Sequence, residues 1–279
     1  MILIADSGST KTNWCLLSKK GNQTVFSTDG INPFFRTSDD IETELRIGLI
    51  PKLNSAVKEI YFYGAGIINE AKINVIRTAL KRLFPGTLIE IQSDLLAAAH
   101  STLGRNPGIV CILGTGSNSG VYDGISIVEH VPPLGFILGD EASGAVMGRK
   151  LLADYLKGVM PEQLSKEFKM QFNSGYAEFM DQVYKKDKPN RSLARYVPFI
   201  KQHIDEIYCE KLVENSMNEF VERNITQYTN FKELPISFVG SVAYHFSSQL
   251  KKVFKKHHLK LGEIEKDPMN GLIRYYQNK

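Results

Sequence analysis

The feature that most constrains the fold is a strand pattern that occurs twice. Residues 2–5 and 108–114 are apolar runs, and a turn of small residues follows each of them, DSGSTKT in the first case and GTGSN in the second. Two more strand-like segments come after each turn, and amphipathic helical segments come later. Strands that alternate with helices predict an α/β protein with a mixed sheet in each half. The shared order of elements indicates a duplication.

A loop with the sequence RNPG, residues 105–108, marks the expected domain boundary. We expect an N-terminal domain over residues 1–106, a C-terminal domain over residues 107–279, and a cleft between them. A mostly helical stretch over about 141–230 predicts a helical insertion in the second domain. The Pro-initiated segment 268–278 predicts a last helix, which is expected to pack back on the first domain.

Composition argues against several classes of function. The 34 basic and 30 acidic residues leave a net charge of +4, which is too small to indicate binding to nucleic acid. No apolar stretch has the length needed to cross a bilayer, and no secretory signal is recognisable, so we expect a cytoplasmic protein. The three cysteines are isolated, which argues against a zinc or iron–sulfur site within the chain.

The first turn, DSGSTKT, has the chemistry of a phosphate site. Gly8 permits a sharp turn and a close approach of a ligand to the backbone. Backbone N–H groups and the hydroxyl groups of Ser9, Thr10 and Thr12 could surround a phosphate. Asp6, at the end of the strand, could hold a hydrated Mg²⁺ ion, which prefers oxygen ligands. The alternative is a simple hairpin turn in which Asp6 accepts hydrogen bonds from its own loop.

Two further turns carry backbone donors at the end of a strand. GTGSN matches neither the dinucleotide fingerprint nor a P-loop, and by itself it is compatible with a simple hairpin. In FVGSVA a strand turns into a helix at Gly240, where a flat ring could lie against the backbone. The N-terminus of that helix would favour an anion, and the alternative is a strand-to-helix corner that Ser241 caps.

Taken in order, these motifs resemble those of the actin-like and sugar kinase superfamily. Within it the chain resembles the N-acetylglucosamine kinase branch, which is grouped with the BadF/BadG/BcrA/BcrD ATPases. The resemblance covers about residues 2–246 and rests on DSGSTKT, GINP, QSDLLAAAHS, GTGSNS, LGFILGDEASGA and FVGSVA. It implies two ribonuclease-H-like (actin-like ATPase) domains. It also implies transfer of the γ-phosphoryl group of ATP, with Mg²⁺, to the 6-hydroxyl group of an amino sugar, N-acetylglucosamine or glucosamine.

The resemblance also implies roles for individual residues. Asp94 matches the catalytic aspartate, which accepts the proton of the attacking hydroxyl group. From the residues alone, a cap for the helix that LLAAAHSTL predicts is the favoured interpretation of Asp94, and the two roles are compatible. The expected nucleotide-binding residues are Asp6 (also beside the metal), Gly8, Ser9, Thr10, Lys11, Thr12, Gly114, Thr115, Gly116, Ser117, Gly240 and Ser241. The expected sugar-binding residues are Asn32, Asp94, Thr115, Gly135 and Asp140.

The chain departs from the family pattern at one place in the expected sugar pocket. PPLG ends at Gly135 where family members often have Gly-Gly-Trp-Gly, and the only tryptophan is Trp14. The exact sugar therefore stays open. Two alternatives remain: an ATPase activator of a 2-hydroxyacyl-CoA dehydratase or benzoyl-CoA reductase system, and a sugar or nucleotide sensor without catalysis. The helical stretch is a candidate surface for a homodimer.

Overall fold

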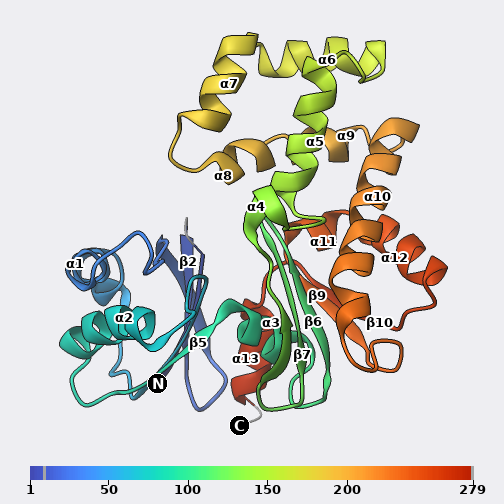
Figure 1. Ribbon diagram of the computed structural model, residues 1–279. Helices are drawn as coiled ribbons and strands as arrows, with labels where there is room; N and C mark the ends of the chain where they lie inside the picture. Colours follow the sequence, from blue (N-terminus) through green and yellow to red (C-terminus); the bar gives the residue numbers. More distant parts are fainter. Residues whose placement is uncertain (9–10, 278–279) are drawn as a thin grey trace. The chain divides into compact units, whose positions relative to one another are not determined.

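The computed structural model describes residues 1–8 and 11–277 and divides into two compact units (Figure 1). Unit 1 comprises Met1–Arg105 and Asp267–Lys279, and unit 2 comprises Asn106–Lys266. Each unit holds a five-stranded mixed sheet with helices, so the α/β prediction is confirmed. Ser9 and Thr10, which we expected to bind a phosphate, lie outside the described residues. Within the described part, no helix combines the length and the apolar character that crossing a membrane requires.

The sheet of unit 1 has the strand order β3-β2-β1-β4-β5. The strands are β1 (Ile2–Ser7), β2 (Lys11–Leu17), β3 (Gln23–Asp29), β4 (Glu59–Gly64) and β5 (Leu88–Ser93). β2 pairs antiparallel with both β1 and β3, whereas β4 pairs parallel with both β1 and β5. Because β1, β4 and β5 run in the same direction, their carboxyl ends share one edge of the sheet. In α/β proteins, that edge is where ligands bind.

Helices cover both faces of this sheet (Figure 1). On one face lie α1 (Ser38–Gly48) and α2 (Glu70–Leu83), and on the other lie α3 (Asp94–Thr102) and α13 (Met269–Gln277). In β1, Leu3 and Ala5 pack on the first face and Ile4 packs on the second. A strand with alternating side chains that is buried on both faces must be apolar throughout, which explains the run ILIA.

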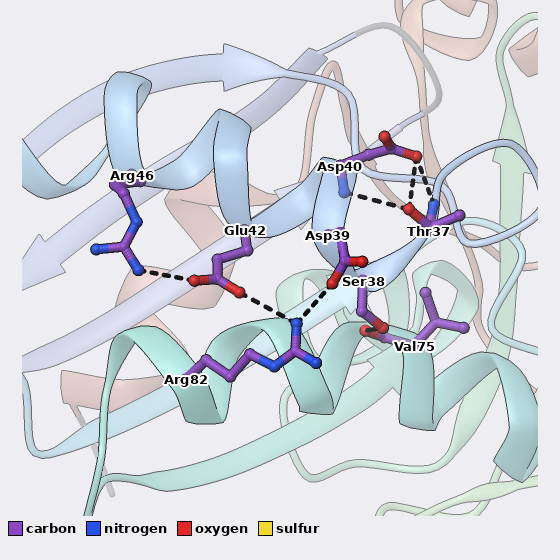
Figure 2. A network of polar contacts seen from close by, with 8 residues as sticks. All are labelled: Thr37, Ser38, Asp39, Asp40, Glu42, Arg46, Val75 and Arg82. Atoms are coloured by element: carbon purple, nitrogen blue, oxygen red, sulfur yellow. Dashed lines mark hydrogen bonds and ion pairs between the residues drawn. The ribbon is translucent and has the colours of Figure 1, made fainter.

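A polar network joins α1 to α2 (Figure 2). The guanidinium group of Arg82 donates hydrogen bonds to Asp39 at 2.6 Å and to Glu42 at 3.2 Å. The hydroxyl group of Ser38 donates to the backbone carbonyl oxygen of Val75 at 2.8 Å. The two helices are therefore held together at their surface as well as through the apolar residues beneath them.

The sheet of unit 2 has the order β10-β9-β6-β7-β8. Its strands are β6 (Gly108–Leu113), β7 (Ser117–Tyr122), β8 (Ile127–Val131), β9 (Ile236–Val239) and β10 (Leu261–Glu265). β6 pairs antiparallel with β7 and parallel with β9, as β1 pairs with β2 and β4 in unit 1. The two sheets therefore have the same topology, as the repeated strand pattern predicts.

Most of the helices in unit 2 lie in the chain between β8 and β9. They are α4 (Gly135–Leu138), α5 (Gly144–Leu156), α6 (Glu162–Phe172), α7 (Tyr176–Tyr184), α8 (Pro189–Ala194), α9 (Val197–Gln202) and α10 (Ile207–Arg223). Helices α6 to α9 lie beyond one end of the sheet (Figure 1). Aromatic rings pack there around Phe168, with Phe179, Tyr196 and Phe199 among its neighbours. The aromatic residues of this segment thus form a core of their own.

Three local features differ from the predicted elements. The sequence favours Ser38 or Asp39 as the cap of α1, but Thr37 caps this helix, because its hydroxyl group accepts the backbone N–H of Asp40. The helix expected after β9 is two helices, α11 (Ser241–His245) and α12 (Ser247–Lys256), which are separated at Phe246. Strand β10 has no predicted counterpart, because its short sequence LGEIE contains a glycine and two glutamates.

Helix α13 approaches α3 so closely that only glycine fits at position 271. A Cβ atom on Gly271 would clash with the backbone carbonyl oxygen of Ser101 and would lie 2.6 Å from the Cα atom of that residue. Gly271→Ala should therefore lower the free energy of unfolding by about 1–3 kcal/mol, measured by urea denaturation. Asn270→Ala, at an exposed position on the same helix, should change it by less than about 0.5 kcal/mol. Equal unfolding midpoints for both variants would contradict the close packing.

Candidate active site

Asp6 lies on the central strand of unit 1, one residue before the carboxyl end of β1. Its neighbours in the sheet are Asn13 on β2 and Tyr63 on β4. Burial is the main cause that raises the pKa of Asp6 to about 7, and the negative charges of Asp94 and then Asp267 raise it further. Three carboxyl groups from distant parts of the chain therefore interact at this edge of the sheet.

Asp267 is a residue that the sequence analysis missed. It stands 261 positions after Asp6 in the chain and immediately precedes Pro268 and α13. Its carboxylate accepts the backbone N–H of Met269 at 3.3 Å, which places it at the start of that helix. The Pro-initiated helix was recognisable from the sequence, but nothing in the sequence indicates that this helix begins near Asp6.

The carboxyl groups fit a magnesium ion that keeps most of its water ligands. Among the described residues no group of three or more His, Cys, Asp or Glu side chains has the geometry to enclose a metal. Mg²⁺ is usually held by one or two carboxylates together with waters and substrate phosphates, so a site without a full set of protein ligands suits it. The raised pKa of Asp6, which is caused first by burial and then by the charges of Asp94 and Asp267, shows that its ionised form is disfavoured, and a bound cation would stabilise that form.

Asp94 is the first residue of α3, directly after β5, and it does not cap the helix. Ser93 is the cap, because its hydroxyl group accepts the backbone N–H of Leu96 at 3.2 Å. Burial raises the pKa of Asp94 to about 6, and hydrogen bonds from the backbone N–H groups of Leu95 and of Asp94 itself oppose this rise. The carboxyl group is thus mostly ionised at neutral pH but remains basic enough to accept a proton.

Two buried hydroxyl groups stabilise the phosphate-type turn of unit 1 through hydrogen bonds. The backbone N–H of Gly8 donates to the carbonyl oxygen of Lys11 at 3.0 Å, and the side chain of Lys11 is exposed. The hydroxyl groups of Ser7 and Thr12 lie 2.7 Å apart, and the N–H of Ile31 donates to them at 3.1 and 3.2 Å. Thr12 is fully buried. Its hydroxyl group therefore supports the turn, and a contact of Thr12 with a phosphate stays a prediction.

Through Ile31 this turn is joined to the loop that carries Asn32. The Ser7 hydroxyl group also lies 2.9 Å from the carbonyl oxygen of Ile31, so one residue connects the two segments by both of its backbone groups. The side chain of Asn32 is buried, and its Oδ1 atom accepts the backbone N–H of Phe34 at 2.9 Å. Within unit 1, the expected phosphate turn and the expected sugar residue thus belong to one hydrogen-bonded framework.

In unit 2 the structure brings the second turn together with Asp140. The N–H of Ser117 donates to the Asp140 carboxylate at 3.3 Å, and a Cβ atom on Gly116 would lie only 3.1 Å from that carboxylate. Burial raises the pKa of Asp140 to about 6; the Ser117 N–H opposes this rise, and the charge of Glu141 adds to it. Gly135 is the first residue of the short helix α4, and the residues on either side of this helix are joined, because the N–H of Asp140 donates to the carbonyl oxygen of Pro133 at 2.8 Å.

A cavity of about 420 Å³ lies beside this turn, within unit 2. Gly114, Thr115 and Ser241, which we predicted to bind the nucleotide, contribute to its lining. Most of the other lining residues are apolar, and they come mainly from α8, α9 and α11. Two of them, Lys201 and His245, supply polar groups. The full set of other lining residues is Gly144, Ala194, Val197, Pro198, Lys201, Val242, His245 and Phe246. The sequence gives no sign of the contribution from α8 and α9, because their apolar residues look like ordinary core.

Gly240 has a packing reason to be glycine. Its φ angle is +125°, and a Cβ atom would clash with the carbonyl oxygen of Leu113 on β6 and lie 2.7 Å from its carbonyl carbon. Gly240 also occupies the cap position of α11, so Ser241 is the first residue of that helix and not its cap. The close approach of β9 to β6 therefore explains this glycine without a ligand.

The fold and the two turns define the class of protein. No family model and no curated protein matches the chain. Among solved structures, a proposed N-acetylglucosamine kinase of Porphyromonas gingivalis is 44% identical over 100% of this chain and 99% of its own, with a TM-score of 0.95. A proposed N-acetylglucosamine kinase of Chromobacterium violaceum is 18% identical, covering 98% of each chain, with a TM-score of 0.76.

A third structure has the same fold with ligands bound. A glucokinase of the ROK family from Streptomyces griseus, in complex with glucose and AMPPNP, is 14% identical over 98% of this chain and 97% of its own, with a TM-score of 0.56. The chain is thus one of the sugar kinases with the actin-like ATPase fold. Given the 44% identity over its full length, it belongs to the N-acetylglucosamine kinase family.

The raised pKa of Asp6 has a consequence for stability. An aspartate whose pKa is raised on folding contributes stability at low pH, and this stability is lost as the pH rises from about 4 to about 7. Asp6→Asn should therefore raise the free energy of unfolding at pH 8 by about 1–3 kcal/mol, and by much less at pH 4.5. Urea denaturation at both pH values measures the difference.

Asp205→Asn is the matched control, because Asp205 is exposed on the surface of unit 2. It should change the free energy of unfolding by less than about 0.5 kcal/mol at either pH. A loss of stability in Asp6→Asn at pH 8 would show that the ionised form of Asp6 is not disfavoured in the folded protein.

Proposed function

We propose that this protein transfers the γ-phosphoryl group of ATP to the 6-hydroxyl group of an amino sugar, with N-acetylglucosamine as the preferred acceptor and glucosamine as the second. The observation that carries the proposal is Asp94, a carboxyl group with a pKa of about 6 that is not used as a helix cap and that interacts with Asp6. The name of the relative from Porphyromonas gingivalis supports the choice of sugar. The AMPPNP in the glucokinase complex supports ATP as the donor.

In unit 1 the proposed roles follow from the chemistry of each group. Asp94 accepts the proton of the 6-hydroxyl group as it attacks, because a neutral hydroxyl group is a weak nucleophile. Asp6 would hold a hydrated Mg²⁺ ion, and this ion would supply positive charge that stabilises the transferring phosphoryl group. Asn32 holds a sugar hydroxyl group. A buried amide discriminates between sugars because a wrong partner leaves it unpaired.

In unit 2 the cavity of about 420 Å³ is proposed to take the nucleoside part of ATP. Its volume is in the range of small-molecule pockets, and walls such as Val197, Pro198 and Phe246 suit the flat face of a base. The turn at Gly114 and Thr115 borders the cavity and would place backbone N–H groups near the phosphates. Asp140, with its raised pKa, is proposed to accept a hydrogen bond from a sugar hydroxyl group.

An ATPase activator with a shared iron–sulfur cluster is disfavoured. Cys15, Cys111 and Cys209 are all buried, and burial raises the pKa of each thiol. A cluster held between two subunits needs thiolates at the surface, which these cysteines do not offer. A sensor without catalysis has no need of a poised base, so Asp94 argues against it.

The decisive experiment is an assay of ADP release with N-acetylglucosamine, glucosamine, N-acetylmannosamine and glucose. We expect the highest kcat/KM with N-acetylglucosamine, and a product whose phosphorus signal is coupled to the C6 protons in NMR. Asp94→Asn should lower kcat by about a hundredfold to ten-thousandfold, because it removes the base and leaves the Ser93 cap in place. Sugar binding by calorimetry should stay within about threefold of the wild type.

Two results would contradict this account. Turnover like the wild type in Asp94→Asn would remove the base from the mechanism. The absence of ATP consumption with all four sugars would favour the sensor without catalysis. Glu90→Gln, on the exposed part of β5, is a suitable control for the removal of a nearby carboxylate and should leave kcat unchanged.

A further inference from the structure

The loop that carries Asn32 is anchored by Lys72, a residue to which neither the motifs nor the proposed chemistry gives a role. Lys72 lies in the first turn of α2. Its ammonium group donates a hydrogen bond to the carbonyl oxygen of Pro33 at 2.9 Å and lies 4.3 Å from the centroid of the Phe34 ring. These two residues directly follow Asn32, so one side chain holds two consecutive positions of the loop.

The loop also packs closely against Gly66, which lies between β4 and α2. Gly66 has a φ angle of +80°, and a Cβ atom there would lie 2.7 Å from Oδ1 of Asn32 and 2.8 Å from Cδ2 of Phe34. The amide group of Asn32 thus rests against the backbone of the segment that leads into α2. With Lys72 and Gly66 in place, the orientation of the Asn32 side chain is fixed before any ligand arrives.

Helix α2, which carries Lys72, is itself held in place by other hydrogen bonds. The Oδ1 atom of Asn69 caps the helix by accepting the backbone N–H of Lys72 at 3.0 Å. Farther along, Arg82 and the carbonyl oxygen of Val75 join α2 to α1 in the network of Figure 2. The first turn of α2 is therefore restrained at its start by the cap and along its length by α1.

We propose that Lys72 is a positioning residue for the acceptor sugar. Through Pro33 and Phe34 it keeps Asn32 in the orientation that binds a sugar hydroxyl group, without touching the sugar itself. The inference rests on the proposed function, because it takes Asn32 as a sugar ligand. Its physical basis is preorganisation: a loop that is ordered beforehand loses less conformational freedom when the ligand binds. Losing the anchor should weaken sugar binding selectively.

The test compares Lys72→Met with Lys72→Arg in steady-state kinetics. Methionine keeps most of the aliphatic chain but loses the charge and the donor. Its KM for the sugar should rise about tenfold, while kcat at saturating sugar and KM for ATP stay within about twofold. Arginine keeps a donor and a cation above the ring, so it should restore KM for the sugar to within about threefold of the wild type.

Two further variants separate positioning from general stability. Lys81→Met, at an exposed position on the same helix, should leave both KM values unchanged. Phe34→Leu removes only the ring beneath the ammonium group, and because Phe34 is 49% exposed the variant should fold. Its KM for the sugar should rise about threefold.

The outcomes are distinguishable. Sugar-dependent turnover with an unchanged sugar KM in Lys72→Met would overturn the positioning role and leave the proposed function intact. A parallel rise of both KM values with a lower melting temperature would also overturn it, because that pattern indicates a purely structural residue. A wild-type protein whose ATP consumption does not depend on any sugar would overturn the proposed function, and this inference with it.

Discussion

The candidate site depends on the burial of Asp6, beside two other carboxyl groups, at one edge of the sheet in unit 1. Asp6 lies near the carboxyl end of a strand that is buried on both faces, and Asp94 and Asp267 each stand at the start of a helix that packs on that sheet. The burial of an ionised Asp6, together with its repulsion by the other two, opposes folding. The packing of α3 and α13, close enough to require Gly271, holds them together nonetheless. Negative charge concentrated in this way is suited to a cation and to the removal of a proton.

The proposed ligand-binding residues are supported by other residues that hold the backbone around them. The Ser7 and Thr12 hydroxyl groups hold the phosphate-type turn against Ile31, and Lys72 holds the next residues of the same segment. In unit 2, β6 and β9 approach so closely at Gly240 that no side chain fits there. Part of what looks like a ligand motif in the sequence is therefore the framework that gives the motif its shape.

How far the sequence predicts the molecule depends on how local each feature is. The repeated strand pattern predicts both sheets. Asp6 can be recognised as a candidate site residue because its strand and the following turn are contiguous in the chain. The role of the Thr12 hydroxyl group depends on Ile31, nineteen residues later, and the importance of Asp267 depends on the packing of the last helix. A choice between Ser93 and Asp94 as helix cap needs the backbone geometry itself. The first two features are tertiary contacts and the third is a local backbone conformation. Periodicity and motif spacing encode neither.

The central claim is that burial, together with the neighbouring carboxylates, disfavours the ionised form of Asp6, and a carboxyl-carbon NMR titration measures this most directly. With ¹³C-labelled aspartate, the signal that disappears in Asp6→Asn identifies the residue. In the protein without nucleotide or magnesium we predict a titration midpoint at about pH 7, and a lower midpoint once magnesium and AMPPNP are added. A midpoint near pH 4, unchanged by magnesium and nucleotide, would contradict the account.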